Sequence, residues 1–339
     1  MSKKTFEDFP AGTVLRFGGY EVNAPEIIAF AQAFDPQPMH LDAEAAKATR
    51  MKGLAAPGMH TCSMVMRLYC DAVLNDAEGL GAPGVDETRW LQPVRPGMVL
   101  NVEWRVTSAR VSQSRPEMGL LGVEMDTRDQ TGLLVMTQRY TGLFARRDQT
   151  PPPPETTPAA RPPRAAPVEL PVFEDPMVNL TRFAHRHEDV VIGARVALGS
   201  RLFTSEDIIH FASKYDPQPF HLSDEGASKS HFGRLSASGW HTASTYMRLF
   251  IDTRDRVRAD RASLPFALNP GGPSPGFRNL RWLRPVQAGD VITYDTTVIA
   301  KEPHPTRPGL GIARNRATGV NQNGVRVFEI EGSSLTVMG

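Results

Sequence analysis

The sequence predicts an α+β protein made of two similar units, in each of which a curved antiparallel sheet wraps around one buried helix. Three observations lead to this prediction: an internal repeat, an apolar helical segment in each copy, and β-like runs that follow it. With 339 residues, the chain is long enough to form two hydrophobic cores.

The repeat is visible without gaps. Residues 30–71 and 211–252 are identical at 20 of 42 positions, at a constant offset of 181. A second matching pair of blocks, 89–97 and 281–289, is offset by 192, so the second copy has 11 additional residues between its blocks. We expect these residues to form a long loop within 254–276, because that segment is rich in arginine, proline and glycine.

A proline-rich segment separates the copies. Nine prolines lie in residues 151–171, a composition that favours extended, semi-rigid chain. We therefore predict an N-terminal unit over residues 1–148, a linker over 149–171 and a C-terminal unit over 172–339.

Each copy opens with a helix-start signal. Asn23 with Glu26 precedes the apolar-periodic residues 27–34, and Thr204 with Asp207 precedes residues 208–215. The Asp-Pro-Gln-Pro stretch that follows is predicted to be non-helical because of its prolines, and short helices are expected at 41–49 and 222–230.

The central helix of each unit is predicted at residues 60–74 and 241–253. Apolar residues cover nearly every face of these segments, which is typical of a buried helix. In the first copy, β-like runs follow at 98–111, 118–127 and 133–144, and the turn residues 129–132 predict a hairpin between the last two. A sheet around a helix buries both apolar surfaces.

Composition narrows the function. The 38 basic and 37 acidic residues nearly balance, which favours small-molecule chemistry over binding to nucleic acid or a membrane surface. No apolar run could span a bilayer, and the N-terminus lacks a signal-peptide core. Cys62 and Cys70, about 12 Å apart along a helix, cannot pair. We expect a cytoplasmic protein.

Two six-residue segments carry the chemistry: Asp35-Pro36-Gln37-Pro38-Met39-His40 and Asp216-Pro217-Gln218-Pro219-Phe220-His221. They resemble the Asp-x-Asn-Pro-aliphatic-His signature of the MaoC-like, R-specific enoyl-CoA hydratase family. Both match it at Asp, Pro and His; both depart from it with Gln in place of Asn, and with Met39 or Phe220 in place of a branched aliphatic residue.

The resemblance implies a double hot-dog fold, in which the tandem units form a pseudo-dimer with a site at each junction. It also implies reversible hydration of trans-2-enoyl-CoA to (R)-3-hydroxyacyl-CoA, a hydro-lyase reaction without metal or other cofactor. Asp35 with His40, and Asp216 with His221, would be the catalytic pairs. An aspartate and a neutral histidine can share the proton transfers around one water.

Charge that develops on the thioester oxygen needs a stabilising donor. Gly58 and Gly239 lie at the entry to the predicted central helices, where free N–H groups and the helix dipole favour negative charge. We expect them to form the oxyanion holes.

Further pocket candidates are His60, His241, Ser238 and Trp240. For the two histidines, a capping or hydrogen-bonded core position weighs more than a metal-ligand role, and no metal-ligand spacing occurs in the sequence. No metal site is predicted. Packing and salt bridging are the preferred roles of Arg67, Arg248, Trp90 and Trp282.

Two other functions stay open. The hot-dog fold also supports acyl-CoA thioesterases, although these generally lack the Asp/His loop. Alternatively, the chain could bind acyl-CoA without catalysis. An acyl-CoA substrate is the expected partner, and a homodimer of the tandem chain is a further possibility.

Overall fold

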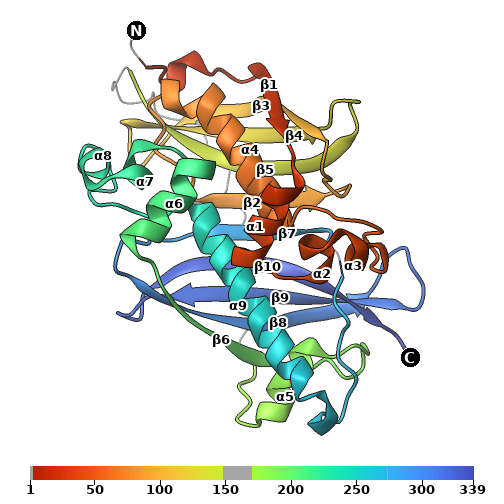
Figure 1. Cartoon of the computed structure of the whole chain (residues 1–339). Coiled ribbons are helices and arrows are strands. Elements are labelled where there is room, and N and C mark those ends of the chain that lie inside the picture. The colour runs from red at the N-terminus through yellow and green to blue at the C-terminus, as the bar shows by residue number, and fades with distance from the viewer. Residues whose placement is uncertain (1–2, 148–169, 273) are drawn as a thin grey trace.

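The computed structural model describes residues 3–147, 170–272 and 274–339. Its strands form one sheet in the order β1-β3-β4-β5-β2-β7-β10-β9-β8-β6, with antiparallel pairing throughout (Figure 1). The predicted linker, 149–171, lies outside the described residues except for its last two positions.

Apart from α5, which precedes the second copy, the two halves of the molecule have the same order of helices and strands. The first half contains β1 (Val14–Glu21), α1 (Ala24–Phe34), α2 (Pro38–Leu41), α3 (Ala43–Lys47), α4 (Gly58–Ala72), β2 (Gly84–Trp90), β3 (Val99–Val111), β4 (Met118–Arg128) and β5 (Leu134–Ala145). The second contains α5 (Pro176–Leu180), β6 (Arg195–Leu202), α6 (Ser205–Tyr215), α7 (Pro219–Leu222), α8 (Asp224–Ser228), α9 (Gly239–Ala259), β7 (Gly276–Trp282), β8 (Val291–Pro303), β9 (Leu310–Val320) and β10 (Arg326–Val337).

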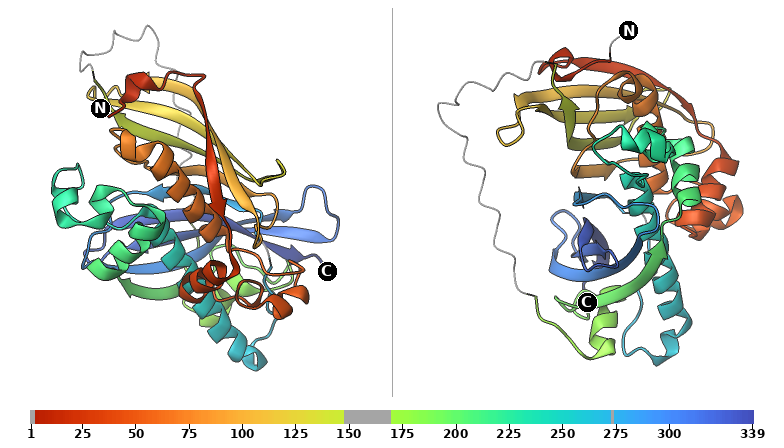
Figure 2. Two further views of the ribbon diagram at one scale, coloured as in Figure 1. Left: turned by 45° about the horizontal axis from the view of Figure 1, so that its top comes forward. Right: turned by 90° about the vertical axis from the view of Figure 1, so that its left-hand side faces the viewer.

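The predicted α+β, double hot-dog architecture is confirmed. In each half the sheet curves around one helix, α4 or α9, and these two helices contact each other across the middle of the molecule (Figure 2). Bounds of β2 to β5 and of β7 to β10 differ by 192 throughout, as the repeat predicts. Asn23 and Thr204 cap α1 and α6, as expected from the sequence.

The halves join through β2 and β7, and two glycines allow it. Gly84 and Gly276 have φ of 156° and 142°, and a Cβ on either would overlap the backbone carbonyl of Leu280 or Thr88 in the opposite strand. The backbones can therefore approach closely enough to pair. Ion pairs such as Arg278–Glu87 (2.9 Å) add to this junction.

Two arginines link helices of one half to helices of the other. Arg67 on α4 donates to the carbonyl oxygens of Ser213 and Lys214 at the end of α6, at 3.2 and 3.3 Å. Arg248 on α9 donates in the same way to Gln32 and Ala33 at the end of α1. A cation at a helix C-terminus satisfies carbonyls that have no partner within the helix, and the predicted packing role of both arginines is confirmed.

Two predictions about local structure were wrong. The loop expected from residue 254 begins later, because α9 continues to Ala259, supported by the Asp255–Arg258 pair at 3.4 Å. The Asp-Pro-Gln-Pro stretches are irregular only in part: Pro38 and Pro219 start the short helices α2 and α7. Proline is compatible with the first helical position, where its missing N–H would have no intrahelical partner.

Cys62 and Cys70 are buried and unpaired, as predicted. Among the described residues, no helix is both long and apolar enough to cross a membrane.

Candidate functional site

Each Asp/His loop connects two helices. The first site consists of Asp35, Gln37 and His40, and the second of Asp216, Gln218 and His221. In both, the aspartate caps the end of one helix and the histidine lies on the following short helix. All six side chains are buried. The loop is therefore a compact unit, repeated with little change.

A backbone carbonyl outside the loop fixes the orientation of each histidine. His221 Nδ1 lies 2.6 Å from the carbonyl oxygen of Ser236, and His40 Nδ1 lies 2.7 Å from that of Ala55. A carbonyl only accepts, so Nδ1 must carry the proton and Nε2 of the neutral ring is left bare. In the second site Nε2 is 3.5 Å from Asp216 Oδ2; in the first, the same distance is 3.8 Å from Asp35. A proton-accepting nitrogen thus faces each carboxylate.

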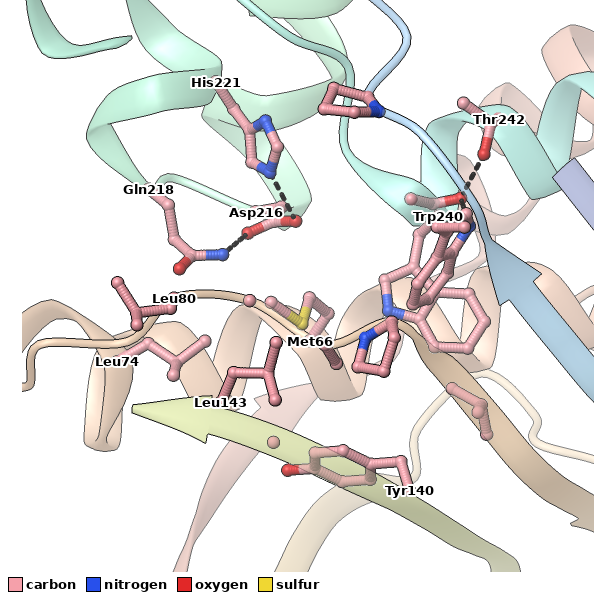
Figure 3. Close-up of a pocket in the computed structure, with 18 of the residues that line it drawn as sticks. Met66, Leu74, Leu80, Tyr140, Leu143, Asp216, Gln218, His221, Trp240 and Thr242 are labelled. Atoms are coloured by element: carbon pink, nitrogen blue, oxygen red, sulfur yellow. Dashed lines mark hydrogen bonds and ion pairs between the residues drawn. The ribbon is translucent and has the colours of Figure 1, made fainter. Parts of the chain in front are cut away.

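Asp216 accepts hydrogen bonds from three side chains. Ser238 Oγ donates to Oδ2 at 2.6 Å, and Gln218 Nε2 donates to Oδ1 at 2.8 Å (Figure 3). Cys70, on α4 of the opposite half, lies with its Sγ 3.3 Å from Oδ1. Burial raises the pKa of the Cys70 thiol well above its usual range, so the S–H remains available to donate. Donors to a carboxylate stabilise its ionised form.

Asp35 has a poorer set of donors. Gln37 Nε2 donates to its Oδ1 at 2.8 Å, but Pro57 and Ile251 stand at the positions equivalent to Ser238 and Cys70 and offer no side-chain donor. Burial raises the pKa of Asp35, and His40, Gln37 and a nearby guanidinium offset this only in part. The first carboxyl group is therefore less readily ionised than an exposed aspartate.

A cavity of about 350 Å³ adjoins the second site. Its wall includes Asp216, Gln218 and His221 on one side and apolar side chains of the first half on the other, among them Met66, Leu74, Leu80, Tyr140 and Leu143 (Figure 3). Asp35, Gln37 and His40 do not line this cavity. The second site is thus formed by the Asp/His loop of the second half and an apolar wall from the first half, as expected for a site at the junction.

The two glycines at the helix starts pack against tryptophan. A Cβ on Gly239 would overlap the Trp282 indole, whose Nε1 donates to the Gly239 carbonyl at 2.9 Å. A Cβ on Gly58 would likewise overlap the Trp90 indole, but Trp90 Nε1 makes no such bond to the Gly58 carbonyl. The indoles therefore fill the space at each Cα that was expected to admit a ligand. Trp90 packs as predicted, whereas Trp282 both packs against Gly239 and lines the cavity. Gly239 still lines the cavity through its remaining surface, whereas Gly58 does not.

The four further pocket candidates separate into two groups. Trp240 lines the cavity, and Ser238 holds Asp216. His60 and His241 do neither, so their assignment to the pocket was wrong. His241 stacks on Phe211 at 4.9 Å between ring centroids, and burial lowers the pKa of His241 to about 3.

His60 belongs to a buried polar cluster at the contact between the halves. Its Nε2 lies 3.3 Å from Glu26 Oε1 and 3.2 Å from the Tyr215 hydroxyl, and Tyr20 donates to the same Glu26 oxygen at 2.6 Å. A polar residue buried with hydrogen-bond partners is the structural role that the sequence favoured for this histidine. Among the described residues, no group of three or more His, Cys, Asp or Glu side chains is arranged to hold a metal ion.

Sequence reasoning missed two residues that reach these sites. Cys70 contacts Asp216 from 146 positions away, and Arg254 donates to Gln37 at 2.8 Å from 217 positions away. No local pattern signals such distant contacts. In the sequence, the 11-residue insertion after the second central helix indicates that the two sites have different surroundings.

Comparison with known proteins decides the family. Residues 8–126, which contain the first Asp/His loop, match the MaoC like domain. The chain belongs to the MaoC-like dehydratase family. Among MaoC-like structures, that of a MaoC domain protein from Chloroflexus aurantiacus J-10-fl has a TM-score of 0.75 at 15% identity, and the match covers 99% of this chain and 98% of that one.

Two further proteins are similar to this chain. A conserved hypothetical protein from Mycobacterium tuberculosis with a double hotdog fold has a TM-score of 0.68 at 17% identity over 98% of both chains. A UPF0336 protein from Streptomyces griseus is 31% identical over 132 residues, which are 38% of this chain and 85% of that protein. The full-length likenesses show that this MaoC-like chain has the double hot-dog fold.

Proposed function

We propose that the protein reversibly hydrates trans-2-enoyl-CoA to (R)-3-hydroxyacyl-CoA at the second site, with Asp216 and His221 as the catalytic residues. The observation that carries this proposal is the position of both groups in the wall of one largely apolar cavity. Membership of the MaoC-like dehydratase family supports the reaction class.

The tautomer of His221 suggests the order of proton transfer. Its bare Nε2 can take a proton from a water that attacks C3, and the resulting imidazolium can return that proton to C2. Asp216, 3.5 Å from Nε2, would orient the water by accepting its second hydrogen and would stabilise the imidazolium. The C3–O and C2–H bonds form, the C2–C3 double bond becomes single, and no proton is left over.

The intermediate is an enolate, whose oxygen needs a donor. Gly239 is the first residue of α9, so its N–H has no partner within the helix and the helix dipole favours negative charge there. We assign the oxyanion role to this N–H, because Gly239 lies in the cavity wall. Trp282 would hold the helix start in place through its bond to the Gly239 carbonyl.

The acyl chain would lie against the first half of the molecule. Leu74, Leu80 and Leu143 provide an apolar surface opposite the Asp/His pair (Figure 3). Burial of apolar surface contributes about 25 cal/mol per Å², which favours an aliphatic acyl group over a polar one.

Substitution of the pair tests the proposal. Asp216→Asn together with His221→Ala should lower the hydration rate of crotonyl-CoA, followed by loss of enoyl absorbance, by about 10³-fold or more. A circular dichroism spectrum and melting temperature like those of the native chain would show that the variant is folded. Undiminished hydration by the folded variant would refute the assignment.

The same assay separates the two other functions. A thioesterase would release free thiol from acyl-CoA, detectable with a thiol reagent, and a non-catalytic protein would bind enoyl-CoA without any change in its absorbance. Either result with the native chain would replace the hydratase proposal.

A further inference from the structure

The first site is covered by an arginine from the opposite half. Arg254, on the part of α9 that has no helical counterpart in α4, is only 11% exposed and donates from one terminal nitrogen to Gln37 Oε1 at 2.8 Å. Its other guanidinium nitrogens contact Asp255 at 3.2 Å. A buried guanidinium with specific acceptors is held in one position.

The insertion lies over this arginine. Gly271 is so close that a Cβ there would be 2.9 Å from the Arg254 guanidinium and 3.8 Å from Gln37 Oε1. Asn269 anchors the segment to the second half: its N–H donates to the Phe183 carbonyl at 2.8 Å and its Nδ2 to the Leu335 carbonyl at 2.6 Å. Arg254 is therefore packed between the first Asp/His loop and an anchored cover.

The second site has no equivalent cover. Val73, the counterpart of Arg254, has no donor group, and α4 ends at Ala72. Gln218 Oε1, the counterpart of the atom that Arg254 contacts, receives no hydrogen bond from the described residues, and Gln218 lines the cavity. In the second site, this face of the Asp/His loop is open to the cavity. In the first site, Arg254 and the insertion occupy the equivalent face.

We propose that Arg254 closes the first site, so that each chain has one open acyl-CoA site and Asp35 with His40 are latent. This inference rests on the proposed function for its turnover assay, and a binding assay tests it separately. Arg254 acts here through Gln37, as a positioning residue that holds the first loop in its closed arrangement.

Two single-residue variants test which of the two sites is active. Asp216→Asn should lower crotonyl-CoA hydration by about 10²-fold or more, whereas Asp35→Asn should change it by less than about two-fold. Titration calorimetry with octanoyl-CoA, a saturated acyl-CoA that cannot be hydrated, should give one site per chain for the native protein and for Asp35→Asn.

Opening the first site is the complementary test. Arg254→Val introduces the residue found at position 73, and should raise the octanoyl-CoA stoichiometry from one to two and give the Asp216→Asn chain measurable hydration. Arg256→Val, in the same extension of α9, is the matched control: its exposed side chain donates to Thr253 and not to Gln37 or the cover, so both values should stay unchanged.

The outcomes are distinct. Two sites in the native chain, or loss of half or more of the activity in Asp35→Asn, would overturn the closure of the first site while leaving hydration intact. Absence of hydration in the native chain, with one octanoyl-CoA site, would refute the proposed reaction but not the closure. If Arg254→Val unfolds, as a thermal melt would show, the two aspartate variants and the native stoichiometry still decide the question.

Discussion

The first and second Asp/His loops differ in what reaches them from elsewhere in the chain. Asp216 receives Ser238 from its own half and Cys70 from the other, and it adjoins an apolar cavity. At the first loop, Pro57 and Ile251 replace those donors, and Arg254 contacts Gln37. Identical motif residues therefore do not make equivalent sites. The difference lies in the side chains that donate to the carboxyl group and in the room left for a ligand.

Outside the Asp/His pair itself, the largest expected effect comes from removing the serine that distinguishes the sites. Ser238→Ala should lower kcat by about 10- to 100-fold, because a hydrogen bond to a charged group contributes roughly 1.5–3 kcal/mol. KM should change little, since Ser238 bonds the carboxylate and does not line the cavity. The acid limb of the pH–rate profile should move to higher pH, because the lost donor stabilises the ionised carboxylate.

Pro57→Ser is the matched control for this variant. It places a hydroxyl at the equivalent position of the first site, and should leave kcat and the pH profile unchanged if that site is closed. A rise in kcat with Pro57→Ser, or an unchanged profile with Ser238→Ala, would mean that the serine does not account for the difference between the sites.

How much of this could be predicted from the sequence depends on the range of the contacts. The repeat offsets place the strands and central helices correctly, because periodicity and turn signals are local. Ser238 is visible in the sequence as a difference from Pro57 in the other copy, although its contact with Asp216 is not. The contacts of Cys70 and Arg254 cross between halves, and only the packing of α4 against α6 and of the α9 extension against the first loop brings them there.

The buried histidines provide a second comparison between the halves. Burial opposes ionisation of Glu26, but hydrogen bonds from His60 and Tyr20 outweigh it and lower the pKa of Glu26 to about 2. A depressed carboxyl pKa contributes stability that is present above the ordinary value and is lost as pH falls toward the folded value. In the second half, His241 Nδ1 has no hydrogen-bond partner among the described residues, and the acid equivalent to Glu26, Asp207, is 43% exposed.

Glu26→Gln should therefore lower the free energy of unfolding by roughly 2–3 kcal/mol at pH 7, measured by urea denaturation. The difference from the native chain should shrink as pH falls from about 4.5 towards 2, where the native carboxylate also becomes protonated. Asp207→Asn, the matched change in the second half, should lower it by less than 1 kcal/mol. Equal effects of the two substitutions would contradict the difference between the hydrogen-bonded Glu26 and the exposed Asp207.

The smallest expected effect concerns the cavity wall at Trp240, where the first half has Met59. The Trp240 indole packs edge-on against Trp282, with 5.5 Å between ring centroids, so it is a rigid part of the wall. Trp240→Met would replace it with a smaller, flexible side chain. We expect kcat/KM for a C8 enoyl-CoA, relative to the C4 substrate, to rise about 3- to 10-fold, since one methylene in an apolar pocket changes specificity by at least this amount.

Met59→Trp is the reciprocal control, and it should leave the C8 to C4 ratio unchanged because residue 59 does not line the cavity. If Trp240→Met alters kcat/KM equally for all chain lengths, the indole contacts the part of the ligand that all substrates share, and the acyl chain lies elsewhere in the cavity. A shift confined to the longer substrate would place the end of the longer acyl chain at Trp240, while the rest of the chain lies against the apolar wall of the first half.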